Sequence, residues 1–265
     1  MHAATATFDR FLKSERTIVI VGLVGVVSLS WLYILTGAGM EKPDMTSAAG
    51  LMGMQTDWSP SYFMLMLFMW WVMMLAMMLP SAAPMILLYS AINSKNRERG
   101  NPFVATGIFV AGYMITWGVF SFLATILQWA LEEAALLSPT MASTSVWFGA
   151  GLLISAGIYQ FTPLKEACLK HCQSPLTFLM SHWRLGRQGA VIIGLEHGVY
   201  CLGCCWMLMG LLFFGGVMNL FWIAGLAAFV LIERLLVIGS WINRIGGALL
   251  IVWGVGLALS QLNVS

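Results

Sequence analysis

The chain has 265 residues, of which 60% are hydrophobic and only 9% are charged. Soluble domains carry roughly 25% charged residues, so this composition excludes an ordinary soluble protein. The net charge of +2 gives no sign of a nucleic-acid partner. We therefore expect a single all-α domain over residues 1–265, embedded in a lipid bilayer.

Seven apolar stretches are long enough to cross a membrane, which takes about 20 helical residues. They are residues 17–39, 62–92, 103–131, 143–161, 190–215, 217–238 and 245–262. The first follows a short basic segment but lacks a small-residue cleavage site, so we expect a retained anchor helix rather than a signal peptide.

Basic residues divide unevenly between the segments that flank these stretches. Twelve of the 13 Lys and Arg residues fall on alternate segments, including Lys165 and Arg234 as loop residues, whereas Lys42 stands alone on the other set. The positive-inside rule then predicts a bacterial inner-membrane protein with a cytoplasmic N-terminus and an outer C-terminus. Residues 1–16 and 162–189 would be cytoplasmic. Residues 40–61 would form an outer loop that contains Met40, Met45, Met52 and Met54.

The first cysteine group lies in the predicted cytoplasmic loop, in the segment KEACLKHCQSP. Cys168 and Cys172 are four residues apart, and His171 follows Cys168 by three. Residues at these spacings share a helix face. Pro163 favours a helix start, so the spacing predicts a short interfacial helix at the cytoplasmic mouth.

The second group lies inside the fifth apolar stretch, in EHGVYCLGCCWMLMG. Helical spacing places His197, Cys201 and Cys204 on one stripe, with Cys205 at its flank. The helical rise of about 1.5 Å per residue puts these cysteines near the bilayer midplane. Gly194 and Gly198 are spaced to let another helix approach closely. No cysteine falls in a predicted outer loop, which argues against a disulfide framework.

Methionines form a third pattern in the second stretch, where Met74, Met77 and Met78 share one face at a similar depth. Methionine is also a common packing residue, so this stripe suits a core as well as a ligand set. Pro80 and Pro84 are expected to interrupt the helix.

Three further residues are weaker candidates. His171 adjoins the first cysteine pair, and Glu196 points away from His197 toward a different neighbour. Glu233, followed by Arg234, lies near the inner end of the sixth stretch and is expected either to pair with the basic loop or to serve the site. Intramembrane ionisable residues are costly and usually functional.

Three of these motifs resemble the DUF2182 family of predicted metal-binding integral membrane proteins. They are MMLAMMLPSAAPM at 73–85, YQFTPLKEACLKHCQSP at 159–175 and GVYCLGCCWMLM at 198–209, accompanied by the Glu233-Arg234 pair. The resemblance runs from about Tyr62 to the C-terminus. It implies a multi-helix membrane fold and points to metal binding by Cys168, Cys172, Cys201, Cys204 and Cys205.

Thiol, thioether and imidazole groups suit soft or borderline metals. We expect copper(I), with zinc or haem as alternatives, and a binding or transport role rather than an enzyme. The leading hypothesis has the Cys168–Cys172 pair exchanging the ion with the midplane site, and a soluble metallochaperone or a membrane-complex subunit as partner. No G-x-x-x-x-G-K-[ST] loop is present, so the chain itself would not use ATP. Two alternatives stay open: a thiol–disulfide relay through Cys201 and Cys204, and a haem-holding subunit that uses His197.

Overall fold

The computed structural model describes residues 2–37, 58–98, 106–138, 141–236 and 239–262. These residues form helices without a β-sheet. The helices are α1 (His2–Leu35), α3 (Pro60–Glu98), α4 (Thr106–Glu133), α5 (Val146–Tyr159), α6 (Pro163–Gln173), α7 (Pro175–His182), α8 (Gly186–Gly210), α9 (Leu212–Gly215), α10 (Leu220–Leu235) and α11 (Gly239–Leu262). The methionines predicted for an outer loop lie outside the described residues.

Five helices of the described chain are long and apolar enough to span a membrane: α1, α3, α4, α8 with α9, and α11. The two other predicted spans are helical but shorter. α5 has 14 residues and α10 has 16, which gives each roughly 20 to 25 Å of length against a hydrocarbon core of about 30 Å. The all-helical prediction is confirmed, and the count of seven spans stays a prediction.

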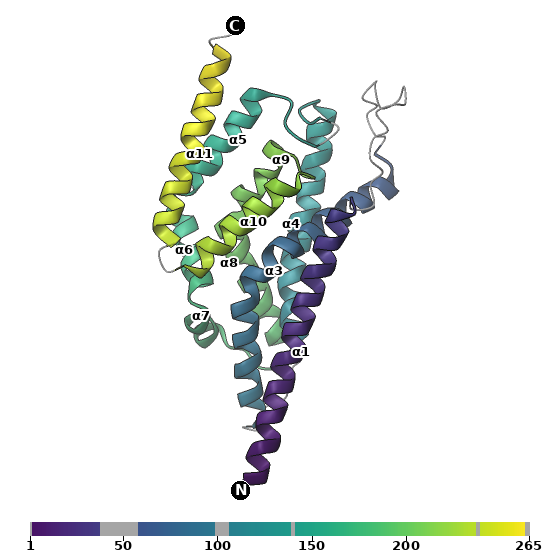
Figure 1. The fold of residues 1–265 in the computed structure, drawn as a ribbon, viewed down its shortest axis with the longest axis vertical. Helices are drawn as coiled ribbons and strands as arrows, with labels where there is room; N and C mark the ends of the chain where they lie inside the picture. Colours follow the sequence, from purple (N-terminus) through teal and green to yellow (C-terminus); the bar gives the residue numbers. More distant parts are fainter. Residues whose placement is uncertain (1, 38–57, 99–105, 139–140, 237–238, 263–265) are drawn as a thin grey trace.

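Helices at the edge of the bundle expose apolar side chains. α1 leaves Val21 and Leu29 exposed, and α11 does the same with Leu249 and Val252. Such extensive apolar exposure is unfavourable in water and favourable in lipid. Figure 1 shows α1 beginning at one end of the molecule and α11 ending at the other.

Helix α3 is continuous from Pro60 to Glu98. Pro80 and Pro84 therefore lie inside the helix and do not end it. Figure 1 shows α3 changing direction along its length. Just before the prolines, the carbonyl of Met78 accepts hydrogen bonds from the side chains of Ser81 and Tyr113. Side-chain donors of this kind satisfy backbone groups at irregular points of membrane helices.

The centre of the bundle is the contact between α4 and α8, which glycines make very close. A Cβ atom on Gly194 would collide with the backbone of Phe109, and one on Gly198 would lie 2.5 Å from Thr116 Oγ1. Gly112 of α4 meets the backbone of Val191 in the same way. The predicted close approach at Gly194 and Gly198 is therefore confirmed.

Candidate metal centre

Three cysteines on α8 face the interior of the bundle. Cys201, Cys204 and Cys205 are each at most 1% exposed. The thiols of Cys204 and Cys205 both donate to the carbonyl of Cys201, at 3.1 and 3.0 Å. This i−3 and i−4 bonding follows directly from helical spacing, and it gathers the two sulfurs beside one backbone oxygen.

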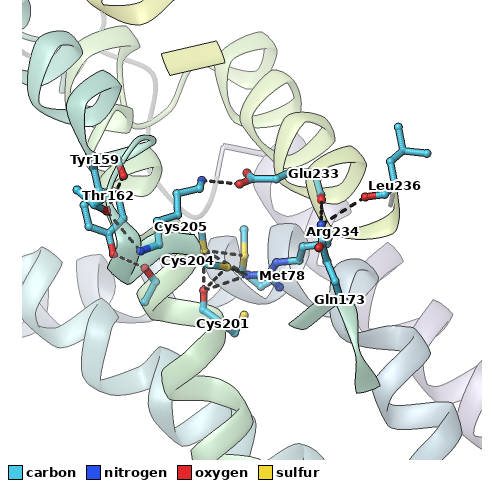
Figure 2. A network of polar contacts seen from close by, with 12 residues as sticks. Met78, Tyr159, Thr162, Gln173, Cys201, Cys204, Cys205, Glu233, Arg234 and Leu236 are labelled. Atoms are coloured by element: carbon cyan, nitrogen blue, oxygen red, sulfur yellow. Dashed lines mark hydrogen bonds and ion pairs between the residues drawn. The ribbon is translucent and has the colours of Figure 1, made fainter. Parts of the chain in front are cut away.

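α3 adds a thioether to this group. Met78 is fully buried, and its Sδ lies 3.9 Å from the Sγ of Cys205 (Figure 2). The prediction that α3 methionines lie at the depth of the α8 cysteines is thus confirmed for Met78. Met74 and Met77 are also buried, and within the described part of the chain no hydrogen bond joins their sulfurs to a thiol.

α6 brings a fourth thiol. Thr162 caps this helix by accepting from the backbone N–H of Lys165, and Pro163 occupies its first turn. From this start, Cys172 reaches α8, where its thiol lies close enough to interact with that of Cys204. The nearby Cys204 thiol and burial hold the pKa of Cys172 well above its usual value. We call Cys172, Cys201, Cys204, Cys205 and Met78 the sulfur cluster.

Cys168 lies at the edge of the cluster, against the backbone of α8. A Cβ atom on Gly203 would be only 2.7 Å from Cys168 Sγ, so the glycine makes room for this thiol. Burial raises the pKa of Cys168. Tyr159, at the end of α5, donates a hydrogen bond to the carbonyl of Gly203 and fixes the same point of α8.

These contacts correct the expected separation between the two cysteine groups. Cys204 lies 18 residues into α8, roughly 27 Å from its start at Gly186. Because Cys168 lies against Gly203 and Cys172 lies close to Cys204, α6 packs beside the later part of α8 rather than beside its start. The segment of residues 162–189 instead folds back along α8, and both cysteine groups belong to one cluster.

A buried arginine on α10 completes the cluster (Figure 2). Arg234 is 6% exposed, and its Nη2 lies 3.1 Å from Cys204 Sγ and 3.4 Å from Cys205 Sγ. The same nitrogen donates to the carbonyl of Cys201 at 3.0 Å, while Nη1 donates to Ser81 on α3 at 2.7 Å. The guanidinium therefore ties α3, α8 and α10 together at the sulfurs.

The neighbouring residue Glu233 pairs with a different cation. Its carboxylate lies 2.5 Å from Lys165 Nζ of α6, and both side chains are almost completely buried. Gln173, at the other end of α6, donates to the carbonyls of Glu233 and Leu236 where α10 ends (Figure 2). α6 is thus held to α10 by an ion pair and by the side chain of Gln173.

This placement corrects the assignment of two basic residues. Lys165 and Arg234 were expected in cytoplasmic loops, but both are buried beside the sulfur cluster. The reason is that each has a partner, a carboxylate for Lys165 and sulfur and oxygen acceptors for Arg234, which makes burial of a cation tolerable. The remaining basic residues keep the uneven distribution.

The predicted ligand His197 lies next to the sulfur cluster rather than in it, with Tyr113 in contact with both its ring and Cys201. Its ring is 2% exposed and packs against Tyr113 and Phe178, at centroid distances of 5.7 and 5.6 Å. Neither ring nitrogen has a hydrogen-bond partner among the described residues. Tyr113 in turn places its hydroxyl 2.9 Å from Cys201 Sγ. His197 therefore adjoins the cluster through Tyr113.

Two further candidates lie away from the sulfurs. Glu196 forms an ion pair with Arg184 at 2.7 Å, which agrees with the expectation that it serves another neighbour. His171 stacks on Tyr200 at a centroid distance of 4.2 Å, and its Nδ1 contacts the carbonyl of Ala167.

The described residues contain no set of three His, Cys, Asp or Glu side chains already converged on a metal position. Sulfur atoms do lie near one another, since Cys205 contacts Met78 and Cys172 lies close to Cys204. Thiol and thioether donors suit a soft ion such as copper(I). Arg234 adds the positive charge that an anionic thiolate complex needs in a buried place. The donor set therefore fits copper(I).

Sequence reasoning missed Arg234, Lys165 and Tyr113 as parts of this centre. The signal for the first was present in the Glu233-Arg234 pair at the end of an apolar stretch, since two charges at that position call for buried partners. Lys165 is four residues from Leu169, a buried position of α6. Nothing in the sequence distinguishes Tyr113 from other aromatic residues of α4.

Fold and site together define a helical protein with several helices able to cross a membrane and a buried sulfur cluster. The PpoB2 family, described as a copper chaperone, matches residues 67–257. That match covers most of the chain, which therefore belongs to the PpoB2 copper chaperone family. A copper-related family is thus confirmed, and the match gives no support to zinc or haem. No curated protein and no solved structure matches the chain.

Proposed function

We propose that this protein binds copper(I) in the sulfur cluster and hands it over to a partner across or at a bacterial inner membrane. The observation that carries the proposal is the convergence of thiols from α6 and α8 with the thioether of Met78 and the cation of Arg234. Thiolate and thioether ligands favour copper(I) over harder ions. The family match supports copper as the cargo.

Charge explains why the cluster suits this ion. Copper(I) held by two thiolates has a net charge of −1, which a single adjacent cation neutralises. Arg234 supplies that cation and has no carboxylate in salt-bridge contact among the described residues. A neutral complex is much cheaper to bury than a charged one.

The test is the copper content of the purified full-length protein. Wild type is expected to retain copper after loading with copper(I) and removal of excess ion, and Cys201→Ser/Cys204→Ser/Cys205→Ser is expected to lose it. Helical content and elution volume of the serine variant show whether it has folded. Unchanged copper in a folded serine variant would overturn the proposal.

A second candidate, the thiol–disulfide relay, is favoured by one observation: the thiol of Cys172 lies close to that of Cys204. Neighbouring thiols on different helices form a disulfide when their geometry allows the S–S bond. Thiol trapping in intact cells separates the two functions. A relay requires an oxidised fraction during growth, whereas a copper site requires reduced thiols that the ion shields from alkylation.

A further inference from the structure

A second group of sulfur atoms lies at the other end of the bundle, around one glutamine of α4. Gln128 is completely buried. Its Nε2 lies 3.6 Å from Met66 Sδ and 3.5 Å from Met141 Sδ, and it donates to Glu132 Oε1 at 2.8 Å. Its Oε1 accepts from the indole of Trp70 at 2.7 Å.

This arrangement differs from ordinary packing of methionine. Thioethers in a core usually pack against apolar groups, but here two of them, from α3 and from the α4–α5 connection, face the same polar nitrogen. Small side-chain rotations would bring both sulfurs to one ion. Met141 has a φ of +56°, a conformation that non-glycine residues rarely adopt and that concentrates at functional sites.

A carboxylate beside the sulfurs supplies the charge for a cation. Glu132 is half-buried, its Oε2 accepts from Trp58 Nε1 at 2.9 Å, and no Lys or Arg of the described chain forms a salt bridge with it. The carboxylate therefore keeps its negative charge available at the border between the buried sulfurs and the surface. A monovalent soft cation would meet thioether ligands and charge compensation in one place.

We propose that Met66 and Met141, with Glu132 beside them, form a second copper(I) site. The proposal rests on the proposed function, since it takes copper(I) as the cargo. Met66 and Met78 lie on the buried face of α3, twelve residues and roughly 18 Å apart, so this helix carries one thioether to each site. Thioethers bind without losing a proton, and they do not form disulfides. The second site is therefore expected to bind copper(I) more weakly than the cysteine site, and disulfide formation cannot inactivate it.

The experiment is a titration of the full-length protein with copper(I) against a chromogenic copper(I) chelator. Wild type is expected to show a tight and a weaker class of site. Met66→Leu/Met141→Leu should lose the weaker class and keep the tight one. Met85→Leu is the matched control, because Met85 is equally buried on α3 but outside the Gln128 group, and it should keep both classes.

The variants separate this proposal from the proposed function. Cys201→Ser/Cys204→Ser/Cys205→Ser should lose only the tight class, and its retention would count against the cysteine site alone. A weaker class that persists in Met66→Leu/Met141→Leu would overturn the thioether site. Should the double variant fail to fold, Met141→Leu by itself, in a connection between helices, must still weaken that class. X-ray absorption of copper(I) in the serine variant should show sulfur neighbours, and an all-oxygen or all-nitrogen shell would likewise reject the site.

Discussion

The guanidinium of Arg234 lies 3.1 Å from the sulfur of Cys204, while the adjacent carboxylate of Glu233 pairs with Lys165 instead. Two neighbouring residues of α10 thus have partners on two different helices, α8 and α6. One anchors α6, and the other directs a positive charge at the sulfurs. The separation leaves Arg234 free to balance negative charge that develops on the thiols when they bind a cation.

Replacing Arg234 by methionine should weaken copper(I) binding while keeping the shape of the site. A hydrogen bond to a charged group contributes about 1.5–3 kcal/mol, so the affinity should fall by roughly 10- to 150-fold. Arg234→Lys should recover part of this loss because it keeps the charge. Competition with a copper(I) chelator measures the copper(I) affinity of wild type and of the two Arg234 variants. Arg244→Met, an exposed change on α11, is the control and should bind like wild type.

Substituting Gly203 by alanine should disturb the cluster through α6. The added Cβ would lie 2.7 Å from Cys168 Sγ and would push α6 away from α8. Overpacking of this kind costs about 1–3 kcal/mol. Gly210→Ala on the same helix meets no atom within 4 Å and should be neutral or slightly stabilising. Thermal unfolding and copper content compare the pair, and equal behaviour of the two variants would contradict the packing described for Cys168.

Breaking the buried ion pair should destabilise the fold strongly. Lys165→Met or Glu233→Gln alone leaves one buried group without its partner, which costs about 3–5 kcal/mol. The double variant should lose less than the sum of the two single variants. Unfolding in detergent provides the double-mutant cycle. Lys170→Met removes the exposed pair with Glu166 on the same helix and should have no resolvable effect; additive single losses would argue against direct pairing at the buried site.

Mild oxidation of the copper-free protein should join Cys172 to Cys204. The two thiols are close enough to interact, so they are the expected disulfide partners. Mass spectrometry of digested protein should find the linked peptides, and copper(I) loaded beforehand should suppress them. Cys172→Ser must abolish the linkage, whereas Cys168→Ser should preserve it. A link that forms equally well with copper present would mean that the ion binds elsewhere.

Hydropathy and helical spacing predicted much of this architecture. The apolar stretches correspond to helices, and the stripe of Cys201 and Cys204 faces inward because residues three and four apart share a helix face. The glycine pair on α8 predicted a close neighbour, which is α4. These features are local properties of single helices, so a single sequence is enough to detect them.

Tertiary contacts set the limit of that reasoning. The position of α6 depends on the turn after α5, on the Lys165–Glu233 pair and on Gln173, and the last two join segments 60 or more residues apart. The sequence placed α6 in a predicted cytoplasmic loop, and this suggested a helix at the periphery of the bundle. Arg234 was mistaken for a loop residue for the same reason, because its acceptors belong to α3 and α8.

The helices that surround the sulfur cluster are held in different ways. The backbones of α4 and α8 are in contact at Gly112 and Gly194, so these two helices cannot move closer together without a collision. By contrast, α6 is short, is flanked by breaks at both ends and is held to α10 by the Lys165–Glu233 pair and by Gln173. In the proposed copper(I) site, Cys172 therefore belongs to the shortest of the three helices that contribute sulfur atoms.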